Sequence, residues 1–242
     1  MWTLHGRSHA AHTAPSRQAG VAVAVLACVA LAACSAADTP SPASTADAVT
    51  VMSLPESGEL EAGTYLVPGF TVPFEITVSD GWESSGWFLH KDVSDETGVA
   101  VNFQAPGYVP TDACAWKGAI VEVDPSTEAF AAAMAAQTST VTTPAVEIMV
   151  GGFPGLELDH AVESDVDINA CDEAKICLHS DSADNCGRWH SRVTAHETYR
   201  VVDLNGERAV IAVLFRGSVA PALTEEARAV FDSIEFAPDK GD

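Results

Sequence analysis

Apolar and polar residues alternate in two early segments of the chain. In VPFEITVSDGW, every second residue from Val72 to Val78 is apolar, and each of the last three is followed by a polar residue. This period predicts a half-buried strand that ends at the Asp80-Gly81 turn. GVAVNFQ repeats the alternation, and its inward residues are Val99, Val101 and Phe103. It predicts a second strand.

Helical spacing occurs in two later segments. Asp124 before Pro125 is typical of an N-cap followed by a proline in the first helical turn. In STEAFAAAMAAQ, Phe130 and Met134 then lie four residues apart, so an alanine-rich amphipathic helix is expected. In LTEEARAVFDSIEF the apolar residues recur at helical spacing, which predicts a second helix that runs into a short edge strand.

Hairpin signals separate the remaining strands. VEIMVGGFPGLELDHAV gives two alternating runs around a Gly-Gly-Phe-Pro-Gly turn, and Asn205-Gly206 supplies the two positive-φ residues of a type I′ turn. The order is strands, a helix, several antiparallel strands and a final helix. This order predicts an α+β fold, in which helices cover an antiparallel β-sheet, over a single domain at 54–238.

The N-terminal segment has the features of an export signal. It carries Arg7 and Arg17 without any acidic residue, followed by the apolar run AGVAVAVLACVALAAC. A hydrocarbon core needs about 20 residues of helix, so this run is too short for a permanent span. We therefore expect export followed by cleavage.

The end of the run, LAAC, resembles the lipobox of bacterial lipoproteins, with Leu31 three positions before Cys34. The resemblance implies a signal peptide at 1–33, a diacylglyceryl group on Cys34 and acylation, for example by palmitate, of the new N-terminus. Cys28 offers a competing match, VLAC, but it leaves a shorter apolar run and places bulky Leu26 where a small residue is expected. An unlipidated secreted protein is the alternative. More than one acyl chain would attach the chain stably to the extracytoplasmic side of the cell membrane.

The residues after Cys34 are small, polar and proline-bearing, and they predict a flexible tether at 34–53. The whole chain has 34 acidic and 12 basic residues; loss of Arg7 and Arg17 with the signal leaves 10 basic residues and a formal net charge of −24. Such a surface repels phosphate backbones, so nucleic-acid binding is not expected.

The body of the chain resembles a family of actinobacterial envelope lipoproteins. The resemblance rests on the segments FTVPFEITVSDGW, DACAWKG, VGGFPGLEL, NACDE, VVDLNGERAVIAV and ARAVFDSIEF. The order of elements is also similar to the PsbP-like sandwich attributed to LpqN-type lipoproteins. These motifs are turns and core strands, so they imply a fold and no chemistry.

The acid-rich stretch from Cys171 to His190 raises the question of a metal site. Structural zinc ligands usually come in closely spaced pairs, whereas five residues separate Cys171 from Cys177 and eight separate Cys177 from Cys186. Outside the cell, the four cysteines that remain once Cys28 is removed and Cys34 is lipidated favour two disulfides. The resemblance implies Cys114 with Cys171 and Cys177 with Cys186, among three possible pairings. The stretch is then a stapled acidic insertion, with His179 and His190 as surface residues.

Other metal and catalytic motifs are incomplete. Asp165, Asp167 and Asn169 imitate the start of a calcium-binding EF-hand loop, but Ala170 and Ile176 stand where that loop needs glycine and glutamate. AHETYR has Arg200 in place of the second histidine of an HExxH motif, and GxSxG and phosphate-binding glycine loops are absent from the sequence. We expect no cofactor and no metal.

His160 could act as a base beside Glu157 or Asp159, but a hydrogen-bonded core histidine is the more ordinary interpretation. Three tryptophans, Trp82, Trp87 and Trp189, could line an apolar groove, although core anchoring and loop plugging are the commoner roles of such residues. Trp116 follows Cys114 closely and is expected to pack on the disulfide that Cys114 forms.

These observations predict a non-catalytic, lipid-anchored envelope protein that binds a small apolar ligand, such as a lipid or glycan, or a protein partner. The alternatives are an envelope hydrolase with an unrecognised site and a purely structural interaction module.

Overall fold

The computed structural model describes residues 51–94 and 96–236. The signal peptide, Cys34 and most of the tether lie outside these residues. The two α-helices are α1 (Thr127–Ala136) and α2 (Pro221–Asp232), and the short 3-10 helices are η1 (Ile168–Ala170) and η2 (Asp172–Ala174). The strands are β1 (Val51–Ser53), β2 (Gly58–Leu60), β3 (Gly63–Val67), β4 (Phe74–Val78), β5 (Trp82–Ser84), β6 (Phe88–Lys91), β7 (Gly98–Gln104), β8 (Tyr108–Pro110), β9 (Ile120–Glu122), β10 (Thr140–Thr142), β11 (Val146–Val150), β12 (Phe153–Val162), β13 (Ile176–His179), β14 (Arg188–His190), β15 (His196–Leu204), β16 (Glu207–Arg216) and β17 (Glu235–Phe236).

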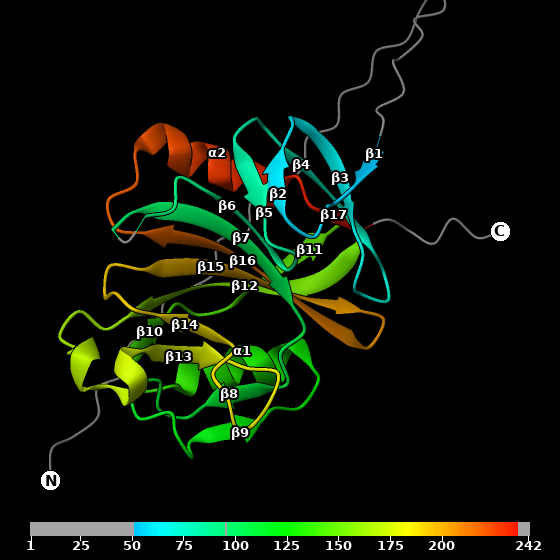
Figure 1. Ribbon diagram of the computed structural model, residues 1–242. Coiled ribbons are helices and arrows are strands. Elements are labelled where there is room, and N and C mark those ends of the chain that lie inside the picture. Colours follow the sequence, from blue (N-terminus) through cyan, green and yellow to red (C-terminus); the bar gives the residue numbers. More distant parts are fainter. Residues whose placement is uncertain (1–50, 95, 237–242) are drawn as a thin grey trace, which may run out of the picture. The chain divides into compact units, whose positions relative to one another are not determined.

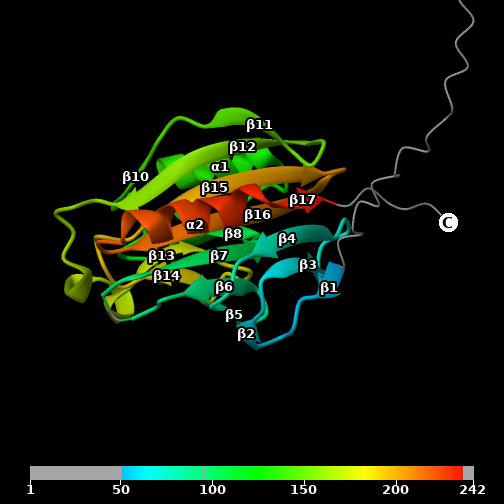
Figure 2. The same ribbon diagram turned by 90° about the horizontal axis from the view of Figure 1, so that it is seen from above.

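A central antiparallel sheet organises the fold (Figure 1). Its strand order is β10-β12-β15-β16-β7-β6-β5-β2, and β11 also pairs with β12 along the outer edge. The β15–β16 hairpin turns at Asn205 and Gly206, whose φ angles of 60° and 99° are the positive values that a type I′ turn requires. Figure 2 shows β10 and β11 at one edge of the sheet and β2 at the other.

The two faces of this sheet are covered differently. On one face, α1 packs through Phe130 and Met134 against Leu158, Tyr199 and neighbouring sheet residues. The β13–β14 and β8–β9 hairpins lie on the same side (Figure 1). The other face is covered by α2 and by a second sheet of order β1-β3-β4-β17. The chain is therefore mostly β, and the predicted cover of helices holds only in part, because strands supply much of it.

Several predicted elements occur where the sequence placed them, with three corrections. The helix N-cap is Ser126, whose Oγ accepts a hydrogen bond from Ala129 N at 3.3 Å, and Asp124 lies before it. Strand β1 occupies 51–53, which the tether was expected to include, and it pairs in parallel with β3. Strand β7 is buried on both faces rather than half-buried, because the sheet is covered on both sides.

The C-terminal helix ends at Asp232 and leads into β17, an edge strand that pairs with β4. Its residues Ala227, Val230 and Phe231 are buried, in agreement with the helical spacing of the sequence. Within residues 51–94 and 96–236, no helix is both long and apolar enough to span a membrane.

Candidate functional site

A groove runs between α1 and the outer edge of the central sheet. Its wide section has a volume of about 780 Å³ and lies between the start of α1, the β11–β12 hairpin and the β15–β16 turn. Ile148, Met149 and Leu156 provide apolar lining there. A volume of this size is typical of sites that hold small molecules.

A narrow section of about 410 Å³ adjoins the wide one, since Glu128 and Leu156 line both. Its helical side is formed by Ala131, Ala132 and Ala135, and its sheet side includes Leu158. Alanine side chains are short, so the helix leaves space beside the sheet that longer residues would fill. We call the two sections together the α1 groove.

Arg208 of β16 fixes the start of α1 at the wide section. Its Nη1 donates to the carbonyl oxygens of Asp124, at 2.5 Å, and Ser126, at 3.2 Å, and its Nη2 donates to that of Pro106. The guanidinium also lies 4.9 Å from the centre of the Phe130 ring. Burial, the largest influence, lowers the pKa of Arg208 from its ordinary value. Arg208 thus holds the loop before α1 against the sheet.

The tryptophans predicted for a groove do not lie together in one. Trp82 is fully buried in the main core, and its indole nitrogen donates to Glu226 Oε1 at 3.0 Å, so the groove prediction is wrong for this residue. Trp87 is 42% exposed and lines a separate pocket of about 420 Å³ with Phe103 and Pro106. Trp189 is 40% exposed, with Lys175 Nζ 5.1 Å from its ring centre.

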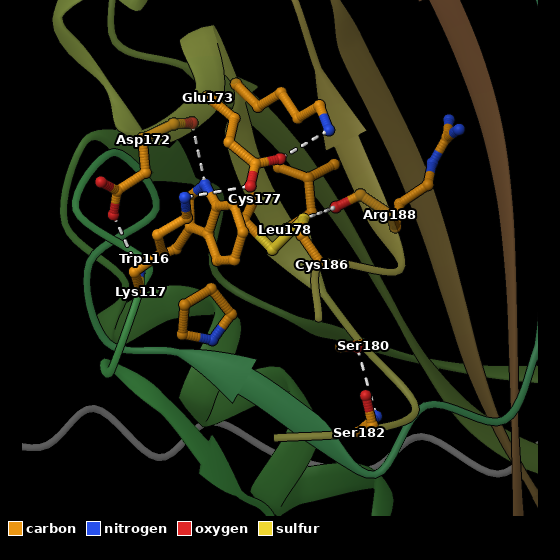
Figure 3. Close-up of a disulfide and its surroundings, with 12 residues drawn as sticks. Trp116, Lys117, Asp172, Glu173, Cys177, Leu178, Ser180, Ser182, Cys186 and Arg188 are labelled. Carbon is orange, nitrogen blue, oxygen red and sulfur yellow. Dashed lines mark hydrogen bonds and ion pairs between the residues drawn. A yellow bond between two sulfur atoms is a disulfide. The ribbon is translucent and has the colours of Figure 1, made fainter. Parts of the chain in front are cut away.

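The stretch from Cys171 to His190 is stapled by disulfides. Cys114 is bonded to Cys171 and Cys177 to Cys186, which is the pairing that the resemblance implied. Trp116 packs against the Cys177–Cys186 bridge rather than the expected Cys114 bridge, and its indole nitrogen donates to the Asp172 carbonyl oxygen at 3.1 Å (Figure 3).

Glu173 forms ion pairs with two lysines on the exposed side of the stapled stretch. The Nζ atoms of Lys117 and Lys175 each lie 3.0 Å from one of its carboxylate oxygens. Hydrogen bonds from Lys117, and then Lys175, lower the pKa of this carboxyl. The carboxylate therefore stays charged between its two lysines.

Between the stapled β13–β14 hairpin and the sheet lies a buried polar cluster. It consists of His179, Arg188, His190 of the hairpin and His160, Glu197, Tyr199 of the sheet. The ring centres of His160 and His179 both lie 6.0 Å from that of Tyr199. Arg188 Nη2 donates to Glu197 Oε1, and His190 Nε2 lies 3.7 Å from the same oxygen.

His179 and His190 are only 3% and 2% exposed, so the prediction that they are surface residues is wrong. Both lie on the paired strands β13 and β14, which place His179 against Tyr199 and His190 against Glu197 of the sheet. The sequence stretch does not reveal these contacts. His160 is buried, as expected for a core histidine. Among the described residues, however, neither of its ring nitrogens has a hydrogen-bond partner.

Burial sets the protonation of the cluster. Loss of solvent is the largest influence on each histidine, and it lowers the pKa of His160 to about 4 and the pKa of His179 and His190 to about 3. Burial alone raises the pKa of Glu197, but opposing charges, Arg188 first, outweigh it and bring the pKa to about 2. The cluster therefore contains neutral imidazoles around one buried ion pair.

The other candidate motifs have structural roles. Asp167 caps η1, since its Oδ1 accepts from Asn169 N at 3.1 Å, and His196 to Arg200 lie in strand β15 rather than on a helix. Glu157 and Asp159 lie on the face opposite His160, where Glu157 pairs with Arg200. In the part of the chain that the structure describes, no group of three or more His, Cys, Asp or Glu could hold a metal ion.

Sequence reasoning missed the α1 groove and the partners of the buried histidines. The alanine run of α1 is the available signal for the groove, because three of its alanines, Ala131, Ala132 and Ala135, line the narrow section. Nothing in the local sequence marks Glu197 as buried, since it stands in a polar HET segment.

Comparison with known proteins adds little to these observations. No protein-family model matches the chain, and no curated protein matches its sequence. Among solved structures, the chain is similar to the solution structure of cyanobacterial PsbP (CyanoP) from Synechocystis sp. PCC 6803. The two are 12% identical with a TM-score of 0.35, over 73% of this chain and 94% of that chain. A likeness at this level carries no conclusion about fold or function.

Proposed function

We propose that the chain is an exported lipoprotein, anchored through Cys34 on the extracytoplasmic side of the cell membrane, that holds a small apolar ligand in the α1 groove. The lipobox and the tether support the anchor, and the stapled hairpin suits an oxidising compartment. Membership of the actinobacterial lipoproteins, and the PsbP-like sandwich of the LpqN type, are parts of this proposal.

The α1 groove is the observation that carries the ligand. It combines an apolar lining at Ile148, Leu156 and Leu158 with a polar mouth at the start of α1, as small-molecule sites commonly do. The groove replaces the tryptophan-lined groove expected from the sequence.

Native mass spectrometry tests the ligand. The full chain carrying Cys34→Ser, which removes the proposed acylation site, is purified without detergent and mixed with a lipid extract of the producing cell. We expect added masses that match small lipids. A protein that comes out empty and gains nothing from the extract would contradict ligand binding.

The anchor has its own test. Metabolic labelling with a palmitate analogue should label the wild-type chain and leave the Cys34→Ser chain unlabelled. Cys28→Ser is the matched control, because Cys28 is removed with the signal when cleavage occurs before Cys34. Label that persists in Cys34→Ser and disappears in Cys28→Ser would move the anchor to the competing site.

A protein partner is the second candidate, favoured by the outer edge of the sheet. Val141 of β10 and Val146 and Met149 of β11 are 56%, 62% and 65% exposed along one edge. An exposed apolar edge strand can pair with a strand of another chain. Val146→Lys should abolish such pairing while leaving lipid uptake unchanged. The hydrolase alternative gains no support, because its named residue, His160, is buried.

A further inference from the structure

The charges around the wide section of the α1 groove are almost all negative. Four carboxylates line it, and Arg208 is the one cation among the described residues that do so. The carboxylates belong to Asp124, Glu128, Glu147 and Asp203.

Arg208 offers little of its charge to a ligand. Its side chain is directed at the carbonyl oxygens of Pro106, Asp124 and Ser126, and the residue is only 7% exposed. The start of α1 is likewise occupied, because Ser126 caps it and Glu128 lies in its first turn. An anionic headgroup would find neither a free guanidinium nor an open helix N-terminus.

Two of the four carboxylates, those of Glu147 and Asp203, belong to the sheet side of the wide section. Glu147 is exposed on the edge strand β11, and no cation among residues 51–94 and 96–236 pairs with it. Asp203 is half-buried, and its Oδ1 accepts a hydrogen bond from Gly206 N at 2.5 Å. These carboxylates line the same section as Ile148 and Leu156, so negative charge and an apolar wall face one space.

We infer that the α1 groove takes a cationic amphiphile, with an ammonium-like headgroup at Glu147 and Asp203 and a single apolar chain along the alanine face of α1. This inference rests on the proposed ligand function and specifies the class of ligand. Complementary charge in a partly desolvated cleft favours the cationic member of a matched series.

The test uses three dodecyl compounds that share one tail. Dodecyltrimethylammonium, dodecyl maltoside and dodecyl sulfate are titrated below their micelle concentrations into the full chain carrying Cys34→Ser, by calorimetry at low and high salt. We expect the ammonium compound to bind about tenfold more tightly than the sulfate at low salt, and the difference to shrink as salt screens it.

A charge-neutralised variant locates the effect. Glu147→Gln combined with Asp203→Asn should remove most of the preference for the cation and retain binding of the maltoside. Glu59→Gln combined with Glu225→Gln changes the net charge equally at exposed positions outside the groove and should keep the preference.

Each result has one consequence. Equal binding of all three compounds, or tighter binding of the sulfate, overturns the inference and leaves the ligand function standing. Tetramethylammonium binding as tightly as the dodecyl compound would show a simple cation site and also overturns it. A loss of the preference for the cation in both double variants would show that this preference comes from net charge rather than from the groove. That result also overturns the inference. If none of the three dodecyl compounds binds, the proposed function fails as well.

Discussion

Acid should destabilise the folded chain through the three buried histidines. His160, His179 and His190 stay neutral in the native state, because burial lowers their pKa to about 4, 3 and 3. In the unfolded chain each imidazole recovers its ordinary pKa of about 6.5 and binds a proton below it. The native state does not gain these protons, so stability is full above about pH 6.5 and is lost as the pH falls towards the native pKa values.

The magnitude follows from the size of the pKa shifts. A pH of about 5 lies about 1.5 units below the pKa of an unfolded imidazole. Protonation then stabilises the unfolded state, relative to the native state, by about 2 kcal/mol for each buried histidine. Three histidines give a loss of about 6 kcal/mol between about pH 8 and about pH 5, a large part of the stability of an ordinary domain. Glu197 adds to the loss only below its ordinary pKa, since its native pKa is about 2.

Urea unfolding of the full chain, followed by tryptophan fluorescence across this pH range, measures the effect. His160→Gln should reduce the loss to about 4 kcal/mol, because one proton fewer is taken up on unfolding. His196→Asn removes an exposed imidazole from the neighbouring strand β15 and should leave the loss at its wild-type value. A free energy of unfolding that stays constant or rises from about pH 8 to about pH 5 would refute the neutral cluster.

Two more outcomes are expected from the structure. Replacing Cys114 and Cys171 by serine opens a loop of sequence separation 57, and should cost about 4 kcal/mol in urea unfolding. The same change at Cys177 and Cys186, with separation 9, should cost about 3 kcal/mol; an opposite order would contradict the chain-entropy argument. Arg208→Met leaves three loop carbonyl oxygens without their donor and should cost about 2 to 3 kcal/mol, measured as a lower midpoint of thermal unfolding. An unchanged midpoint would show that Arg208 does not hold the loop.

The predictable parts of the fold were those encoded by neighbouring residues. The alternation from Val99 to Phe103 and the Asn205-Gly206 turn each depend on a few consecutive positions, and both are found in the structure. The boundary at β1 was missed because its residues, Val51–Ser53, show no clear period and gain their order by pairing with β3.

The buried cluster and the groove depend on contacts between distant segments. His179 and His190 stand among acidic residues and were assigned to the surface, yet the stapled hairpin places them against Glu197 of the sheet. The sequence leaves Trp82 open between a groove and the core, and the structure places it after the Asp80-Gly81 turn in a strand that faces the main core. The sequence therefore identifies the ionisable side chains. Their burial and their partners depend on the pairing of strands that are distant in the sequence.

Binding of a neutral apolar probe in the α1 groove tests the central claim most directly. N-phenyl-1-naphthylamine, which fluoresces when it leaves water, is titrated into the full chain carrying Cys34→Ser, alone and combined with Ala132→Trp or Ala229→Trp. Ala132 lines the narrow section, whereas Ala229 is an exposed alanine of α2 outside the groove. The account predicts saturable fluorescence that is lost with Ala132→Trp and retained with Ala229→Trp. Saturation that is absent, or equal in both variants, would contradict it.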